Sequence, residues 1–348
     1  MNRYYTTVTS SLLIFLIIST IIPVTSALSK THTTHPLSLQ ELINQAPSGT
    51  TIELTTSNYT EPLIITKPLH LKGNRTHPTH LQITSPSNGY ALWINAENVT
   101  LSNLTISNTA PGLYTTAIKI SAPHTTIQNC IIHDTPIGIA IWSSQNTITH
   151  CQFSTCDDEG IVLLGTSTRP CTNTTISECI FQLNCDGIEL QYAAHTQINL
   201  CAFTNNTHAG IDAIGSNNTH LTITHCKFDQ NQGFGVYLHR TTHTTINDCL
   251  FDHDTITTYD ATENILQNNT NASLQLMTPT IPPVDHYNAF EYSNQQPTHQ
   301  TLLNQASSNT QEYTETTTSP YSFRVLQCIL SRIQTMLTYF EQFHHDQM

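Results

Sequence analysis

Apolar residues recur through the middle of the chain in one fixed order. Six blocks each contain an Ile, a Cys three residues later, and an Ile or Phe two residues after the Cys. The six cysteines of these blocks are Cys130, Cys151, Cys179, Cys201, Cys226 and Cys249. The blocks follow one another at roughly 21 to 28 residues, a period typical of solenoids whose coils stack on one another.

Each block contains at least two short strands. Residues 146–153 alternate apolar and polar side chains with period 2, and residues 160–163 form a second apolar run after Gly160. Both patterns predict β-strands. We therefore expect an all-β solenoid over residues 36–255, in which equivalent Ile, Cys and Phe side chains stack at about 4.8 Å. The glycines at the start of the second strand are Gly138, Gly160, Gly187, Gly210 and Gly235.

Ten cysteines suggest disulfides in an exported protein, but the six repeated ones are predicted to form a buried ladder of unreactive free thiols. Side chains that stack in parallel seldom present the dihedral angle of a disulfide. Cys156, Cys171 and Cys185 fall on turns outside this ladder and are better disulfide candidates, and Cys328 is left over.

Residues 1–27 resemble a secretory signal peptide. An apolar run from Leu12 to Ile22 precedes small residues that end at Ala27. This run is shorter than a membrane span and is interrupted by Ser19 and Thr20, so cleavage is favoured over an uncleaved anchor. The mature protein is expected to be secreted or attached to the cell surface.

The segments on either side of the repeats differ from them. Ser38 and Glu41 form a predicted capping box that begins a short helix, which would cover the first coil. Residues 256–320 are rich in Asn, Thr, Gln and Pro and are predicted to be a linker or a loose wrap. Residues 321–345 have the spacing of an amphipathic helix, interpreted as a plug for the last coil or, less favoured, as a membrane-surface or partner-binding helix.

Charge excludes several partners. The 348 residues carry 11 Lys and Arg against 24 Asp and Glu, a formal net charge of -13. A nucleic-acid partner is not expected, because no basic face can neutralise phosphates. Membrane contact is expected only through the signal segment, or weakly through the C-terminal helix, whose only Lys or Arg residues are Arg324 and Arg332.

The N-terminal region identifies a family resemblance. Residues 38–54, followed by Asn58-Tyr59-Thr60-Glu61 and residues 67–74, resemble the opening of secreted right-handed parallel β-helix proteins. The likeness is to the pectin-lyase-like superfamily, particularly its NosD-type repeat branch, and covers about residues 37 to 255. It implies a right-handed parallel β-helix. That superfamily includes lyases, hydrolases, epimerases, adhesins and inactive members, so the resemblance leaves catalysis open.

One column of each coil is predicted to point outward and to carry acidic residues. Two residues after the repeat Gly stand Ala140, Val162, Glu189, Asp212 and Tyr237. Carboxylates on adjacent coils suit a glycosidase or a Ca²⁺ site. Asp186, Glu189 and Asp212 are therefore the candidate catalytic residues, and Glu189 with Asp212 the candidate Ca²⁺ ligands.

The segment from Asn184 to Glu189 is similar to the Asn-Thr-Asp-Gly-x-Asp motif of polygalacturonases, with Asp186 and Glu189 in its acidic positions. The partners of that motif are missing. His208 and Ala209 stand where that family has an Asp pair, and Tyr237 and His239 replace its Arg-x-Lys. An acidic, solvated surface without catalysis is the favoured interpretation.

Aromatic and basic side chains near this column are candidates for glycan binding. They are Trp142, Tyr192, Tyr237, His239 and Arg240. Within residues 98–255 the only cations are Lys119, Arg169, Lys227 and Arg240, and of these only Arg240 is expected beside the acidic column. A neutral glycan, or an acidic one bridged by Ca²⁺, is thus expected.

The sequence as a whole favours an exported protein that binds extracellular or envelope glycans without cleaving them. The main alternative is a polysaccharide hydrolase or lyase that uses Asp186, Glu189 and Asp212 with help from His239 or Arg240. The NosD resemblance implies a further alternative, copper handling, but the 19 histidines show no repeated ligand spacing and no copper site is expected. A purely architectural envelope protein is the remaining possibility.

Overall fold

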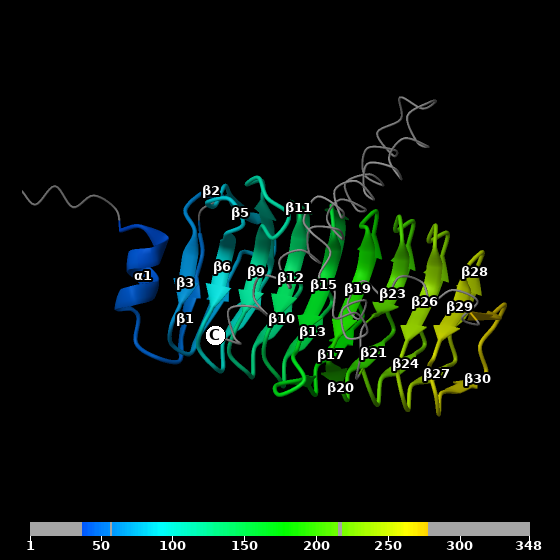
Figure 1. The fold of residues 1–348 in the computed structure, drawn as a ribbon. Helices are drawn as coiled ribbons and strands as arrows, with labels where there is room; N and C mark the ends of the chain where they lie inside the picture. The colour runs from blue at the N-terminus through cyan, green and yellow to red at the C-terminus, as the bar shows by residue number, and fades with distance from the viewer. Residues whose placement is uncertain (1–36, 56–57, 215–217, 278–348) are drawn as a thin grey trace, which may run out of the picture. The chain divides into compact units, whose positions relative to one another are not determined.

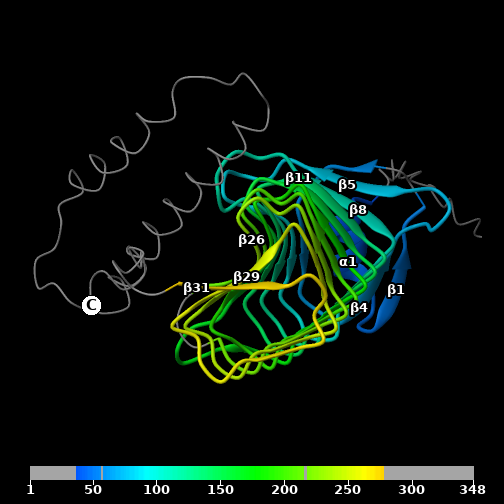
Figure 2. The ribbon, with the colours of Figure 1, turned by 90° about the vertical axis from the view of Figure 1, so that its right-hand side faces the viewer.

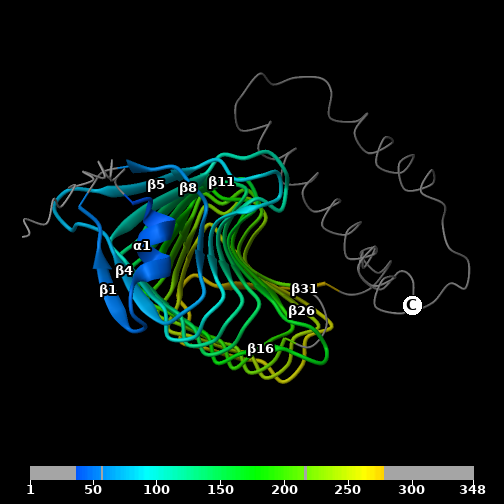
Figure 3. The ribbon, with the colours of Figure 1, turned by 90° about the vertical axis from the view of Figure 1, so that its left-hand side faces the viewer.

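The structure is a computed structural model that describes residues 37–55, 58–214 and 218–277. Within these residues the chain winds into a parallel β-solenoid made of three long sheets, as predicted (Figure 1). The coils lie over one another when viewed along the axis (Figures 2 and 3). The signal segment, residues 278–320 of the expected linker and the expected helix at 321–345 lie outside the described residues.

The first sheet contains the Ile of each repeat. Ile148 pairs in register with Ile127 on one side and with Ile176 on the other, so these side chains stack along the axis. Its ten described strands are β1 (Thr50–Glu53), β4 (Leu69–Lys72), β7 (Thr100–Ser102), β10 (Thr126–Gln128), β13 (Thr147–Thr149), β17 (Thr175–Ser177), β21 (Gln197–Asn199), β24 (Thr222–Thr224), β27 (Thr245–Asn247) and β30 (Ile265–Gln267).

The second sheet contains the aromatic residue of each repeat. Phe203 pairs with Phe181 and Phe228, and stacked rings from Phe153 to Phe251 lie 4.7 to 4.9 Å apart. Its nine described strands are β2 (Asn58–Tyr59), β5 (Thr79–Ile83), β8 (Leu104–Asn108), β11 (Ile131–Thr135), β14 (Gln152–Cys156), β18 (Ile180–Gln182), β22 (Ala202–Thr204), β25 (Lys227–Asp229) and β28 (Leu250–Asp252).

The third sheet contains the candidate site, and its strands begin near the Gly of each repeat. Its ten described strands are β3 (Leu63–Ile65), β6 (Tyr90–Ile94), β9 (Thr116–Ile120), β12 (Ile137–Ile141), β15 (Glu159–Leu164), β19 (Asp186–Gln191), β23 (Ala209–Ala213), β26 (Phe234–His239), β29 (Thr255–Tyr259) and β31 (Ser273–Met277). Two further short strands, β16 (Cys171–Thr172) and β20 (Ala193–Ala194), pair with each other between the third and first sheets.

The repeat glycines make room for the Phe ladder. A Cβ atom on Gly187 would lie 2.5 Å from the carbonyl oxygen of Gly210 and 2.6 Å from a ring carbon of Phe203. Any larger residue would therefore push the ring or the neighbouring coil away. This contact explains why Gly and Phe recur together in the sequence.

The cysteine ladder is confirmed. All six repeated cysteines are free and buried. A hydrogen bond between its protonated thiol and Cys201 is the largest cause that raises the pKa of Cys226 to about 12. Burial adds to this shift, so the thiol stays protonated and unreactive at neutral pH.

The three predicted disulfide candidates differ in their state. Cys156 and Cys171 are free and buried, and burial is the largest cause that raises the pKa of Cys171 to about 12. Cys185 is disulfide-bonded, and Cys328 lies outside the described residues. Two of the three turn cysteines therefore behave as small buried side chains rather than as bridges.

The N-terminal cap has the predicted form. Helix α1 (Leu39–Gln45) begins at a capping box between Ser38 and Glu41, and lies across the end of the coil (Figure 3). The side chain of Gln40 accepts a hydrogen bond from the backbone N–H of Ile64 and donates one to its carbonyl oxygen. These bonds satisfy the open edge of β3, which would otherwise be free to pair with another chain.

The solenoid continues past the boundary at residue 255 expected from the sequence. Strands β29, β30 and β31 extend all but the second sheet up to Met277. Leu274 pairs with the buried Ile256 but is half exposed, because no described coil follows it. These coils were not predicted because residues 256–277 are polar in composition, and the inward positions of a last coil need not be strongly apolar. In the part of the chain that the structure describes, no helix is long and apolar enough to cross a membrane.

Candidate functional site

The outer face of the third sheet consists of the side chains that point away from the solenoid interior. One column of this face runs in register along the sheet. Its members on the seven strands from β6 to β26 are Trp93, Lys119, Ala140, Val162, Glu189, Asp212 and Tyr237. The five positions predicted from the sequence are thus in one row, and the structure adds Trp93 and Lys119 to it.

Apolar side chains occupy the middle of this outer face. Ile137, Ala140 and Val162 are buried and form a cluster of their own with Leu164, separate from the main core. Ala140 and Val162 are neighbours on β12 and β15. This apolar stretch separates the acidic part of the face from Lys119.

The acidic cluster consists of Glu159, Asp186, Glu189 and Asp212. Glu159 pairs in register with Asp186, and Glu189 with Asp212, so the four carboxylates come from the consecutive strands β15, β19 and β23. Asp186 and Asp212 have no exposed surface, and Glu159 and Glu189 are also buried. The three candidates from the sequence are therefore brought together, with Glu159 as a fourth member.

His208 links two of these carboxylates and was not among the candidate site residues. Its Nδ1 atom lies 2.7 Å from Oδ1 of Asp186 and 3.7 Å from Oδ2 of Asp212. The backbone N–H of Ala209 also donates to Oδ1 of Asp186, at 2.8 Å. Such contacts are what a buried carboxylate needs to offset the loss of water. The signal for this residue in the sequence was a His directly before β23, the strand that contains Asp212.

Asp186, His208 and Asp212 can hold a metal ion. They each offer a ligand atom, and these three atoms lie within 4.8 Å of one another. Glu189, which the sequence paired with Asp212 as a Ca²⁺ ligand, accepts a hydrogen bond from the side chain of Gln191. A donor set with an imidazole suits Zn²⁺ or Mn²⁺, whereas Ca²⁺ prefers oxygen ligands alone.

Aromatic side chains follow the acidic cluster on the C-terminal side. The ring of Phe234 stacks on Tyr237, with centroids 4.9 Å apart, and meets the edge of His208 at 5.4 Å. His239 is buried and lies 5.1 Å from the ring of Tyr259. Tyr237 is half-buried and belongs to the outward column itself. Tyr237 and His239 therefore lie on β26, beside the acidic cluster, and their role in glycan binding stays a prediction.

A second aromatic group precedes the acidic cluster. The ammonium nitrogen of Lys119 lies 4.4, 5.3 and 5.6 Å from the ring centroids of Tyr90, Trp93 and Trp142. It also donates a hydrogen bond of 2.8 Å to the hydroxyl of Tyr90. Trp142 is 44% exposed, and the indole N–H of Trp93 donates to Ser121. We call these four residues the Lys119 cluster: Tyr90, Trp93, Lys119 and Trp142.

The other two predicted binding residues lie on turns. Tyr192 follows β19 in a left-handed conformation with φ 48°, and Arg240 follows β26 with φ 51°. The Nε atom of Arg240 lies 3.7 Å from a carboxylate oxygen of Asp260. The expectation that Arg240 is the only cation beside the acidic column is therefore wrong, because Lys119 lies in that column and Arg240 lies at the edge of the sheet.

Turn histidines also stack from coil to coil. The rings of His195, His220 and His243 are separated by 4.7 Å at each step, and His243 pairs with Glu263. Each occupies the same left-handed turn position, with φ between 53° and 56°. The rings of His220 and His243 are nearly parallel, so their nitrogen lone pairs lie in parallel planes and do not converge on one ion.

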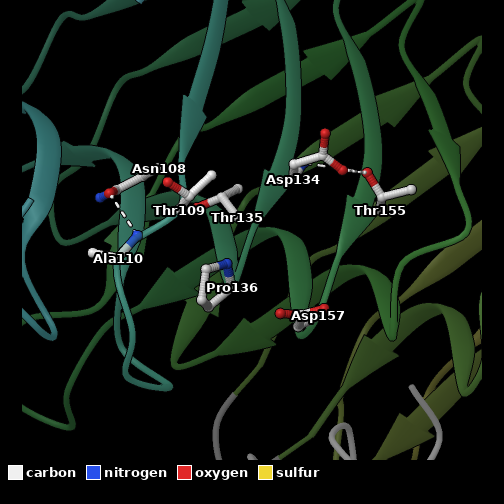
Figure 4. Close-up of a pocket in the computed structure, with 8 residues that line it drawn as sticks. All are labelled: Asn108, Thr109, Ala110, Asp134, Thr135, Pro136, Thr155 and Asp157. Atoms are coloured by element: carbon white, nitrogen blue, oxygen red, sulfur yellow. Dashed lines mark hydrogen bonds between the residues drawn. The ribbon is translucent and has the colours of Figure 1, made fainter. Parts of the chain in front are cut away.

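A polar pocket of about 270 Å³ lies at the edge between the second and third sheets (Figure 4). Asp134 and Thr155 face each other across adjacent coils there, and the hydroxyl of Thr155 donates to Asp134 at 2.8 Å. None of the site residues predicted from the sequence lines this pocket. Its lining residues are Asn108, Thr109, Ala110, Asp134, Thr135, Pro136, Thr155 and Asp157.

Parallel strands that wind into one solenoid of three sheets define the class of the parallel β-helix proteins. The family model described as "Right handed beta helix region" matches residues 69–221 and 165–271, which together are more than half of the chain. The protein therefore belongs to the right-handed β-helix family.

Solved structures with the same fold have little sequence in common with this chain. An alginate lyase from a Paenibacillus species has a TM-score of 0.51 at 15% identity, over 69% of this chain and 96% of that one. The A-module of a mannuronan C-5 epimerase from Azotobacter vinelandii has a TM-score of 0.46 at 11% identity, over 69% of this chain and 91% of the module. None of the curated proteins matches the sequence. These likenesses show the fold alone.

Proposed function

We propose that this protein is an extracytoplasmic glycan-binding protein that holds a polysaccharide along the outer face of the third sheet without cleaving it. The observation that carries the proposal is the order of side chains on that face. Aromatic residues lie before and after the acidic cluster, with Trp142 on one side and Tyr237 on the other. Aromatic rings offer flat apolar surfaces against which sugar rings can stack.

Binding without cleavage is supported by the surroundings of the carboxylates. Asp186 and Asp212 have no exposed surface, and His208 contacts both. A general acid or nucleophile has to reach the glycosidic bond of its substrate. Carboxylates held in this way are better suited to hold the coils of β19 and β23 together, with or without a divalent cation, than to act on a polymer.

Export is part of the proposal and is supported by the signal-like residues 1–27. The Paenibacillus protein of the same fold is an alginate lyase, in keeping with a glycan ligand. Assignment to the NosD-type branch remains a prediction from the sequence resemblance.

A second candidate function is cleavage of the glycan. It is favoured by the grouping of Asp186, His208 and Asp212, because their ligand atoms are close enough to hold a metal ion. A metal held by these three residues would supply a positive charge near a sugar carboxylate or a leaving oxygen. The residues of this chain would then orient the substrate from both aromatic ends of the face.

The experiment that tests these functions is a panel of neutral and acidic polysaccharides, with and without added Ca²⁺, Mn²⁺ or Zn²⁺. Binding is measured by calorimetry and product release by chromatography, for the wild type, Glu189→Gln and Asp212→Asn. The control is Glu53→Gln, which removes an exposed carboxylate on the first sheet. We expect saturable binding without products. Turnover that Glu189→Gln or Asp212→Asn abolishes and Glu53→Gln keeps would establish the enzyme, and absence of binding to every polysaccharide would overturn both functions.

A further inference from the structure

We propose that the Lys119 cluster is a subsite for an anionic sugar residue, such as a uronate. This inference rests on the proposed glycan-binding function and assigns it a class of ligand. Lys119 lies on β9, in register with Trp93 on one side and Ala140 on the other. Its ammonium group is therefore part of the outer face along which the glycan is expected to lie.

The first argument is the charge of Lys119. The group is half-buried among aromatic rings, and among the described residues no carboxylate lies within ion-pair distance of it. Of the other described lysines, Lys72 and Lys227 are paired with Glu53 and Asp229. Lys67 donates to the backbone carbonyl oxygens of Asn44 and Ala46. An ammonium group has three N–H donors, and the hydroxyl of Tyr90 takes one of them. The charge is thus positioned for an anion supplied by a ligand.

The second argument is how firmly Lys119 is held. Aromatic faces attract a cation through their negative electrostatic potential, and three rings lie within 6 Å of this one. The hydroxyl of Tyr90 fixes the ammonium group further. Holding a long side chain in place before a ligand arrives lowers the entropy lost on binding. A hydrogen bond from a fixed ammonium to a carboxylate is among the stronger polar contacts.

The third argument is the exposed ring beside this charge. Trp142 follows β12 and is 44% exposed although it lies within cation–π distance of Lys119. A sugar stacked on this indole can place its carboxylate near the ammonium group. A neutral sugar would gain the stacking alone, so the pair of residues selects for an acidic sugar.

The position of the Lys119 cluster determines where an acidic glycan lies along the outer face of the third sheet. Three strand spacings separate Lys119 from Glu189 in the same column, about 14 Å at ~4.8 Å for each spacing. Ala140 and Val162 lie between them and carry no charge. An acidic glycan is therefore held by charge at the Lys119 cluster, away from the repulsion of the acidic cluster. The ligand must be several sugars long to reach both ends of the face.

The test uses one ligand in two charge states. A hexasaccharide derived from polygalacturonate and the same hexasaccharide after reduction of its carboxyl groups are compared by calorimetry at low salt. Wild-type protein is expected to bind the anionic form about 10- to 100-fold more tightly, from one or two charge-assisted hydrogen bonds. Lys119→Gln should lose this preference, and Lys119→Arg should keep most of it. The matched control is Lys227→Gln, which removes a lysine of the second sheet and should leave the preference unchanged.

Trp142→Ala separates the inference from the function on which it rests, because it removes the stacking surface and should weaken binding of both forms. If both forms bind equally well to wild type and Trp142→Ala weakens both, the glycan-binding function stands and the anionic subsite is wrong. If neither form binds at any length, both fail for this class of glycan. An equal loss of preference in Lys119→Gln and Lys227→Gln would also overturn the subsite, because it would show a nonspecific effect of net charge.

Discussion

The inner and outer sides of the third sheet are formed by the same strands, yet only the inner side repeats. The inner column keeps one type of side chain over seven coils: Ile118, Ile139, Ile161, Ile188, Ile211, Val236 and Ile256. The adjacent outer column passes from Trp93 and Lys119 through Ala140 and Val162 to Glu189 and Asp212. Packing between coils therefore determines the inner side, whereas contacts with other molecules are left to determine the outer side.

The inner ladders should carry the largest share of stability. Phe203→Ala removes a fully buried ring that stacks on two others, and should cost about 3–5 kcal/mol in the free energy of unfolding. Its matched control on the outer side, Trp142→Ala, should cost about 1 kcal/mol or less, because the ring is 44% exposed. Urea denaturation followed by circular dichroism measures both. Equal losses would show that the two sides do not differ as proposed.

A smaller loss is expected where a side chain is added inside the coil. Gly187→Ala places a methyl group 2.6 Å from a ring carbon of Phe203 and should destabilise the protein by ~1–3 kcal/mol. Combining it with Phe203→Leu should give less than the sum of the two single losses, because the smaller side chain relieves part of the clash. Strict additivity in the same denaturation assay would mean that the ring is not what the glycine accommodates.

The smallest change should be a gain of stability, at the end of a buried ladder of amides. The amide groups of Asn184, Asn206 and Asn231 donate to the carbonyl oxygens of Phe153, Phe181 and Phe203. Asp254 accepts hydrogen bonds from Asn231 in the preceding coil but has no amide to donate. Asp254→Asn should restore a donor at this position and stabilise the protein by about 0.5–1.5 kcal/mol at neutral pH.

The gain from Asp254→Asn should depend on pH. Burial is the largest cause that raises the pKa of Asp254 above its ordinary value. A carboxyl group with a raised pKa in the folded state destabilises the fold as the pH rises, because the unfolded chain ionises first. The gain should therefore be largest at neutral pH and should shrink below about pH 3, where both states are protonated. A gain that is the same at both pH values would contradict this role of ionisation.

Local sequence patterns were enough to predict the interior of the solenoid. The spacing of Ile, Cys, Phe and Gly is imposed by contacts between neighbouring coils, so each column could be found by comparing one repeat with the next. The capping box of α1 is local as well, since Ser38 and Glu41 are three residues apart. The same period of the repeat places Glu189 and Asp212 in one outward column, as their register in the structure confirms.

The same reasoning missed Lys119 and His208 for two different reasons. The coil of Lys119 has Ala117 where later coils have Gly, so it could not be aligned with them from the sequence. His208 precedes its strand and reaches back to Asp186 on the previous coil. That contact depends on how the turn before β23 is folded, which the period of the repeat does not specify.

The sequence by itself determined the solenoid, its free-thiol and phenylalanine ladders, and which column carries the acidic residues. These follow from a periodic requirement, because every coil must bury the same kind of side chain against the next. Only the tertiary structure decided that Lys119 is surrounded by three aromatic rings, that His208 lies between Asp186 and Asp212, and that Arg240 pairs with Asp260 at the edge. Outward side chains have no repeating partner, so their neighbours are fixed by the register and turn lengths of the folded coils.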